Sequence, residues 1–254
     1  ILRISNNTPH NQPWVTNVKT LAFPSLADYV EENGETLDQT NFDDDGWSLS
    51  DSSTQKLLKK LLLNSDLLEE LINKKMFRGI VTGFNEAFII NEEIKQKLIS
   101  EDIRNMEIIK PFIIGKDIKR YKIENEKRYI IFTRRGIKIN NYPSILKYLS
   151  QYKERLMPKP KNWKGRDWKG RKPGVYQWYE IQDSTDYYME FEKPKITWGN
   201  LAITPKFCID YDGFYVNAPS VIISSDDLYL LGILNSKICY YVISKIAAGR
   251  QGGF

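Results

Sequence analysis

Histidine and cysteine are scarce in this chain. Its one histidine, His10, lies in a Pro- and Asn-rich N-terminal stretch. A single histidine excludes a zinc site with several histidine ligands, and no candidate catalytic group lies near it in the sequence to form a histidine-based relay. The two cysteines, Cys208 and Cys239, lack a Cys-x-x-Cys spacing. We therefore expect reduced, buried thiols in a cytoplasmic protein.

Long hydrophobic runs and catalytic motifs are also missing. No apolar run approaches the roughly 18 residues of a membrane span, and no signal peptide is recognisable. The chain contains no Asn-Pro-Pro-Tyr-type motif for amino-methylation, no Walker A loop and no Gly-rich dinucleotide turn. We predict no catalytic residue, no metal site and no cofactor in this segment.

The two ends of the chain indicate a piece of a longer polypeptide. The first residue is Ile1 and the last residues, 247–254, end in a Gly-rich run without a closing element. We expect a catalytic site, if the parent protein has one, to lie outside these residues.

Positive charge is concentrated in the middle of the sequence. Residues 101–172 carry 21 Lys and Arg against 8 Asp and Glu, whereas residues 1–100 carry 10 against 15 and residues 173–254 carry 6 against 9. A region with a net charge of +13 focuses positive potential and typically binds a polyanion, above all nucleic acid.

The hydrophobic pattern predicts an α+β fold of mixed strands and helices. Short apolar runs predict strands over 76–80, 87–90, 108–114, 128–132, 195–198, 207–210 and 214–216. Helices are expected over 92–100, 143–152 and 226–247, with a helical hairpin near 54–75. Gly83 and Gly213 are expected to form tight turns between neighbouring strands, and 31–53 an acidic surface loop.

A basic and aromatic stretch follows the predicted helix over 143–152. Residues 153–172 contain nine Lys or Arg and a tandem repeat, Trp163-Lys-Gly-Arg166 followed by Trp168-Lys-Gly-Arg171. Cations interleaved with aromatic residues and glycines suit a loop that approaches a phosphate backbone, and arginines also recognise guanine. We predict that the nucleic acid is contacted by Arg120, Arg134, Arg135, Lys159, Lys161, Trp163, Lys164, Arg166, Trp168, Lys169, Arg171 and Lys172.

Composition leaves other functions open. The tryptophans would also suit stacking on unpaired bases in an RNA or single-stranded nucleic-acid binding module. Scattered acidic residues leave a small metal-dependent nuclease as a further alternative. The basic stretch would have no binding function if it were simply a solvated lysine-rich loop.

Several motifs, in the right order, resemble one family. Phe77–Ile90 resembles the Gly-Ile-x-Thr-Gly-x-Asn-x-Ala-Phe signature that opens the TaqI-like C-terminal specificity domain of N6-adenine DNA methyltransferases and type IIG restriction-modification enzymes. The structural residues of this motif are Gly79, Thr82, Gly83 and Asn85. Later landmarks are similar at Ile109–Tyr121, Tyr142–Leu149, Trp178–Glu180, Phe191–Ile196 and Leu231–Lys237.

The resemblance covers roughly residues 47–250 and implies a target-recognition role. It implies that residues 54–254 form the specificity domain, truncated at its C-terminal end, and that residues 1–53 are an extension or linker from a missing catalytic domain. Its expected partners are double-stranded DNA and a methyltransferase domain of the same polypeptide. That domain would methylate DNA with S-adenosylmethionine as its cofactor, and the resemblance implies a role in phage defence. Whether the parent also cuts DNA stays open.

Overall fold

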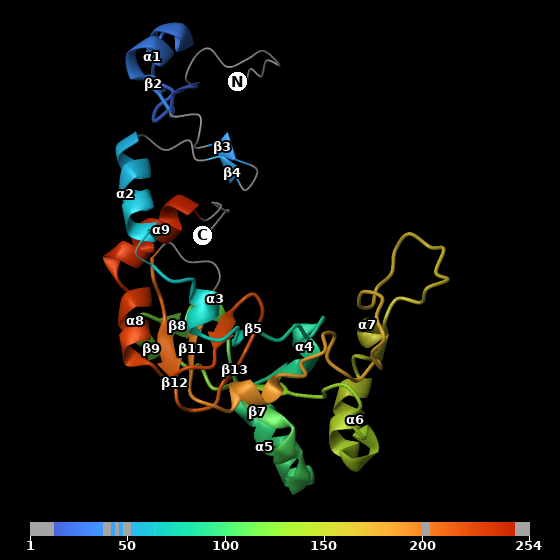
Figure 1. Cartoon of the computed structure of the whole chain (residues 1–254). Coiled ribbons are helices and arrows are strands. Elements are labelled where there is room, and N and C mark those ends of the chain that lie inside the picture. The colour runs from blue at the N-terminus through green and yellow to red at the C-terminus, as the bar shows by residue number, and fades with distance from the viewer. Residues whose placement is uncertain are drawn as a thin grey trace. The chain divides into compact units, whose positions relative to one another are not determined.

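The computed structural model describes residues 13–37, 42–43, 46–47, 52–63, 65–199 and 204–246. The chain divides into two compact units, Ile1–Leu67 and Leu68–Phe254 (Figure 1). The predicted boundary after residue 53 stays a prediction, although the helix that spans this point begins at Ser52. His10 and residues 247–254 lie outside the described residues.

The first unit consists of short elements. Strands β1 (Trp14–Val15) and β2 (Glu35–Thr36) pair antiparallel, and β3 (Phe42–Asp43) pairs with β4 (Gly46–Trp47). Helix α1 (Leu26–Asn33) is capped by the Ser25 side chain, and α2 spans Ser52–Leu62. The prediction of a loop over 31–53 was therefore wrong where the structure describes it, because the end of α1 and three strands lie there. Polar composition hid strands of only two residues each.

Two four-stranded sheets organise the second unit (Figure 1). The first has the order β13-β7-β10-β6, with bounds Tyr215–Val216, Ile109–Ile113, Arg128–Ile131 and Ile89–Ile90. The second has the order β12-β11-β14-β5, with bounds Cys208–Asp210, Lys195–Trp198, Val221–Ile223 and Met76–Arg78. All neighbours pair antiparallel except β13 and β7, which are parallel. A small ribbon pairs β8 (Ile118–Lys119) with β9 (Lys122–Ile123).

Helices complete the second unit and confirm the α+β class. They are α3 (Leu68–Leu71), α4 (Asn85–Phe88), α5 (Glu92–Glu101), α6 (Pro143–Ser150), α7 (Lys153–Leu156), α8 (Leu228–Leu234) and α9 (Lys237–Ile246). The Asn91 side chain caps α5 by accepting from the Ile94 amide, and Pro143 opens α6. Among the described helices, none is long and apolar enough to cross a membrane.

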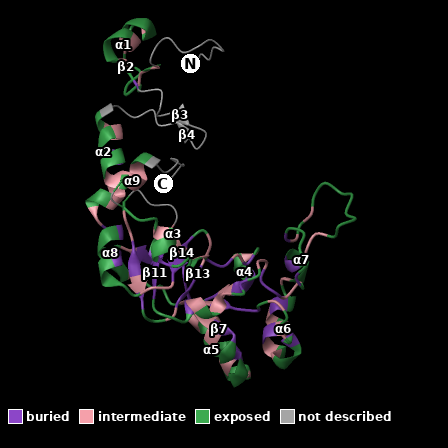
Figure 2. Ribbon diagram, viewed as in Figure 1, coloured by how far each residue is buried: buried purple, intermediate pink, exposed green. Residues whose placement is uncertain are grey.

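Apolar side chains from both sheets form the core. The larger cluster surrounds the first sheet and includes Phe88, Phe112 and Ile130, and the smaller cluster joins the second sheet to α8 through Ile223 and Leu230. The buried residues follow the strands and the inner sides of α6 and α8 in Figure 2. Because most strand residues are β-branched or aromatic, they pack well on these pleated surfaces.

Both predicted turns exist, but neither joins neighbouring strands. Gly83 has φ +78° and Gly213 has φ +74°, as expected. After Gly83 the chain enters helix α4 and not the predicted strand over 87–90, of which only β6 forms, and β6 pairs in a different sheet from β5. The predicted hairpin around Gly213 was also wrong, because β12 pairs with β11 while β13 pairs with β7.

Candidate nucleic-acid interface

Residues 159–170 form an exposed loop, here called the basic loop. Its two ends are joined by a bridge between Pro158 and Arg171, in which the Arg171 amide donates to the Met157 carbonyl (2.9 Å) and the Lys159 amide to the Arg171 carbonyl (3.0 Å). The loop follows α7 and projects from it in Figure 1. Its base is thus fixed by backbone hydrogen bonds while the remainder faces solvent.

The cations of this loop are available to a ligand. Lys161, Lys164, Arg166 and Lys169 are exposed, as is the neighbouring Lys172, whereas Lys159 is half-buried. Lys169 lies 3.7 Å from Glu154, and both side chains are more than three-quarters exposed. Exposed pairs of this kind contribute little stability, so a phosphate could displace Glu154 at small cost.

The tandem repeat has a structural basis in the packing of each tryptophan on its own glycine. A Cβ built on Gly165 would lie 2.7 Å from the Trp163 ring, and one on Gly170 would lie 2.8 Å from Nε1 of Trp168. The two indoles meet edge to face, with ring centroids 5.0 Å apart, and Trp168 donates to the Arg171 carbonyl (3.0 Å). The tryptophans therefore fold back onto the loop, and Trp163 remains 41% exposed.

Arg171 lies in the interior beneath the loop. It is 3% exposed, and its guanidinium donates to carbonyls of three separate segments. Its partners are Leu156 (2.8 Å), Thr82 (2.9 Å), Glu180 (2.7 Å), Trp178 (3.0 Å) and Gln177 (3.4 Å). Burial lowers the pKa of Arg171 to about 10, so the side chain stays charged at neutral pH. The sequence predicted a DNA contact for Arg171, but its donors are directed to the protein's own backbone.

The predicted structural motif lies against this arginine. Thr82 is buried; its hydroxyl donates to Asn85 (2.6 Å) and accepts from the Phe84 amide, while its carbonyl binds Arg171. Gly79 permits a close backbone approach, because a Cβ there would lie 2.4 Å from the Asn217 carbonyl oxygen. A Cβ on Gly83 would lie 2.7 Å from Cδ of Arg171.

Two other predicted arginines use their guanidinium groups in hydrogen bonds to the protein itself. Arg135 donates to the Ile181 carbonyl (2.8 Å) and the Gln182 carbonyl and lies 3.5 Å from Glu180. Arg120, beside the turn between β8 and β9, donates to the Asn235 carbonyl (3.0 Å).

Two arginines keep their guanidinium groups accessible. Arg134 is exposed beside the Tyr188 ring, 5.1 Å from its centroid, with a long 3.5 Å contact to the Arg135 carbonyl. Arg166 is exposed and has no hydrogen-bond partner in the part of the chain that the structure describes. The structure therefore brings Arg166, both tryptophans and the predicted lysines other than Lys172 together in the basic loop, places Lys172 next to it and leaves Arg120 apart, at the turn between β8 and β9.

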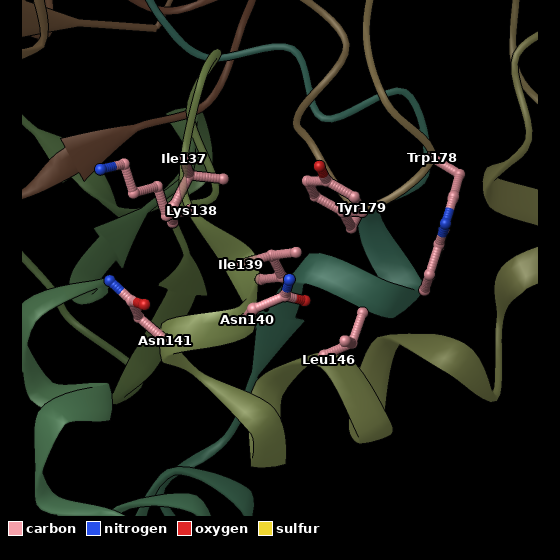
Figure 3. Close-up of a pocket in the computed structure, with 8 residues that line it drawn as sticks. All are labelled: Ile137, Lys138, Ile139, Asn140, Asn141, Leu146, Trp178 and Tyr179. Carbon is pink, nitrogen blue, oxygen red and sulfur yellow. The ribbon is translucent and has the colours of Figure 1, made fainter.

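Sequence reasoning missed a pocket beside the basic loop. It is a cavity of about 510 Å³ between the segment after β10 and the segment after the loop (Figure 3). Its lining residues are Ile137, Lys138, Ile139, Asn140, Asn141, Leu146, Trp178 and Tyr179. Asn140 and Asn141 belong to no recognisable sequence motif, since they lie between a predicted strand and a predicted helix. Trp178 was the one residue of the pocket whose type indicated a binding surface.

Glu180, also missed, holds the two sides of this pocket together. It is 4% exposed; Oε1 accepts from the Gly136 amide (2.8 Å) and Oε2 from the Gln177 amide (2.9 Å). One carboxylate thereby fixes the segment after β10 against the segment that carries Trp178.

Other charged and thiol groups have structural surroundings. Lys195 and Asp210 form a fully buried ion pair, and Asp210 also accepts from the amides of Asp212 and Phe214, which shapes the turn at Gly213. Cys208 and Cys239 are free thiols whose pKa values are raised by burial. Within the described ranges, no three His, Cys, Asp or Glu side chains are grouped to hold a metal ion.

Comparison with known proteins identifies the family. The family model of the TaqI-like C-terminal specificity domain matches residues 110–254. The Type II methyltransferase M.MjaIV of Methanocaldococcus jannaschii is 30% identical over 191 residues, which cover 69% of this chain and 58% of that protein. A solved structure, the Type IIL restriction-modification enzyme MmeI in complex with DNA, matches at 13% identity and a TM-score of 0.43 over 65% of this chain and 21% of that one. The resemblance found in the sequence is confirmed: the chain belongs to the TaqI-like C-terminal specificity domain family.

Proposed function

We propose that this chain recognises a specific sequence in duplex DNA as the specificity domain of a larger adenine-specific DNA methyltransferase or type IIG restriction-modification enzyme. The observation that supports this most strongly is the basic loop. Its cations are exposed, its base is fixed by backbone hydrogen bonds, and it lies within a chain of the specificity-domain family. Cations held in this way neutralise phosphates and release counterions.

We assign different tasks to the predicted DNA-contacting residues. Lys161, Lys164, Lys169 and Lys172 would contact phosphates, with Lys159 at the edge of the loop. Arg134 and Arg166 would contact bases, because a free guanidinium fork matches the O6 and N7 acceptors of guanine. Arg120, Arg135 and Arg171 donate to protein carbonyls, which supports a role in positioning the contacts.

The activity of the whole protein is part of the proposal. The chain spans 58% of the length of its methyltransferase relative, so residues beyond it would hold the catalytic domain, bind S-adenosylmethionine and methylate an adenine turned out of the duplex. We further propose a cytoplasmic protein in which residues 54–254 confer specificity.

Salt dependence of DNA binding tests the proposal. With about 5 phosphates engaged, the slope of log K against log[salt] should be near −4 to −5. The measurement is fluorescence anisotropy of a labelled duplex at a series of salt concentrations, with Lys97→Ala in α5 as a control outside the loop. Binding that does not change with salt would refute phosphate contact, and preference for a single-stranded competitor would favour a single-stranded nucleic-acid module.

A further inference from the structure

The pocket beside the basic loop has walls suited to a flat, polar ring. The Trp178 and Tyr179 rings stand at 80° to each other, with centroids 5.6 Å apart, so that one of them can stack on a flat ring while the other meets its edge, and Leu146 adds an apolar contact. Asn140 and Asn141 are exposed, and no side-chain hydrogen-bond partner is found for either amide among the described residues. Figure 3 shows the Asn140 amide between Tyr179 and Leu146.

The two walls of the pocket are held rigidly. Arg171 binds the Trp178 carbonyl (3.0 Å), and Glu180 links the backbone at Gly136 to that at Gln177. On the other wall, the residues Ile139–Asn141 form a 3₁₀ turn. A cavity held from both sides is preformed for its ligand, as binding pockets generally are.

Two lysines lie at the pocket. Lys138 is among its lining residues, and the Lys153 ammonium lies over the Trp178 ring, 5.3 Å from its centroid, which leaves the other face of the indole for a base. Through Arg171, the wall carrying Trp178 is joined to the base of the basic loop. The pocket therefore lies toward the base of the loop.

We propose that this pocket binds an unpaired nucleobase of a DNA strand held by the basic loop. The inference rests on the proposed function. Aromatic side chains stack on the face of a base, and in an intact duplex that face is covered by the neighbouring bases. An asparagine amide offers both a donor and an acceptor, which matches the hydrogen-bonding edge of adenine.

A duplex with one extra, unpaired adenine provides the test. The protein should bind it about 10-fold more tightly than the fully paired duplex of the same sequence, the effect of one stacked base. With 2-aminopurine in place of that adenine, stacking should quench its fluorescence. Asn140→Ala and Trp178→Ala should abolish the preference and the quenching, whereas Trp178→Phe should retain both.

One control variant and one second test variant separate this inference from the proposed function. Lys161→Ala should weaken binding of both duplexes by the same factor. If Trp178→Ala does not fold, Asn140→Ala decides, because its exposed side chain has no part in the core. Equal affinity for the two duplexes, or a preference unchanged in Asn140→Ala, overturns the inference alone; failure to bind either duplex overturns the proposed function and this inference with it.

Discussion

Arg171 joins three segments of the chain at the base of the candidate interface through its guanidinium. Replacing it by alanine removes the donor from the carbonyls of Leu156, Glu180 and Trp178. Loss of buried, charge-assisted hydrogen bonds of this kind should lower the free energy of unfolding by about 3 kcal/mol or more. Arg171→Lys should also be destabilising, since an ammonium lacks the planar fork. Thermal and urea denaturation measure both effects.

Arg166 is the matched control for this prediction. It occupies the same place in the first copy of the tandem repeat but is exposed. Arg166→Ala should leave the melting temperature unchanged and weaken DNA binding. Equal melting temperatures for Arg166→Ala and Arg171→Ala would contradict the structural role of Arg171.

Gly83 and Gly136 separate backbone strain from crowding. Both have positive φ, +78° and +73°, but a Cβ on Gly83 would meet Arg171 and Gln182 at 2.7 Å, whereas one on Gly136 would meet nothing within 4 Å. Strain at positive φ costs about 1–3 kcal/mol. Gly83→Ala should therefore lower the melting temperature clearly more than Gly136→Ala. If calorimetry gave similar decreases in melting temperature for the two variants, the Arg171 and Gln182 side chains would have moved to make room for the added methyl group at Gly83.

Residue type alone could not distinguish the roles of the two repeat arginines. The sequence predicted a loop over these lysines, and Lys161, Lys164 and Lys169 are exposed in it, because a segment rich in Lys, Gly and Pro lacks the apolar side chains that burial requires. Arg166 and Arg171 follow the same Trp-Lys-Gly motif, yet only Arg171 closes the loop over the Thr82 segment. That difference depends on a contact across 89 residues, which no local pattern encodes.

Helix α5 is anchored to the first sheet by a surface carboxylate. The Tyr129 hydroxyl on β10 donates to Glu92 in the first turn of the helix, and Lys95 lies 3.0 Å from the same carboxylate. Together with Gln96, these contacts lower the pKa of Glu92 to about 2. The stability that Glu92 contributes is therefore present above its ordinary pKa of 4.5 and is lost as the pH falls toward 2.

Tyr129→Phe should move the pKa of Glu92 upward, because it removes the largest cause of the shift. NMR titration of the Glu92 carboxyl measures this directly, and acid unfolding should begin at a higher pH. Tyr121→Phe, at an exposed tyrosine on the β8–β9 turn, should change neither quantity. An unaltered Glu92 titration in Tyr129→Phe would show that the lysine and glutamine suffice.

The positions of the longer strands and helices were predictable from the sequence, whereas the pairing partners of the strands were not. Apolar runs located β7, β10 and β11, and the helix expected over 92–100 is α5. Turn chemistry at Gly213 was also correct, but Asp210 directs that turn from one sheet to the other. The residues of a turn specify that the chain reverses its direction. Which strands then pair is decided by how the apolar faces of the whole sheets are buried.

Across the whole molecule, affinity and specificity should depend on different cations. Lys161→Ala and Lys164→Ala should weaken binding to the recognised site and to a scrambled duplex equally, since both lysines contact phosphates in our proposal. Arg134→Ala or Arg166→Ala should cost roughly 1–3 kcal/mol on the recognised site alone. Affinities at fixed salt measure this, with the sequence methylated by the parent enzyme as the recognised site. Equal losses on both duplexes for all four variants would move base contact to the strip from Tyr176 to Trp198.

The closed base of the basic loop has a consequence for how such domains diversify. Since residues 158 and 171 are already bridged, the chain between them can be shortened, lengthened or replaced without altering the path of the backbone on either side. We therefore expect the segment to be exchangeable between relatives, with Arg171 kept as its attachment point. Grafting the corresponding segment of a relative between these two positions should transfer its DNA-contacting properties while the scaffold stays intact.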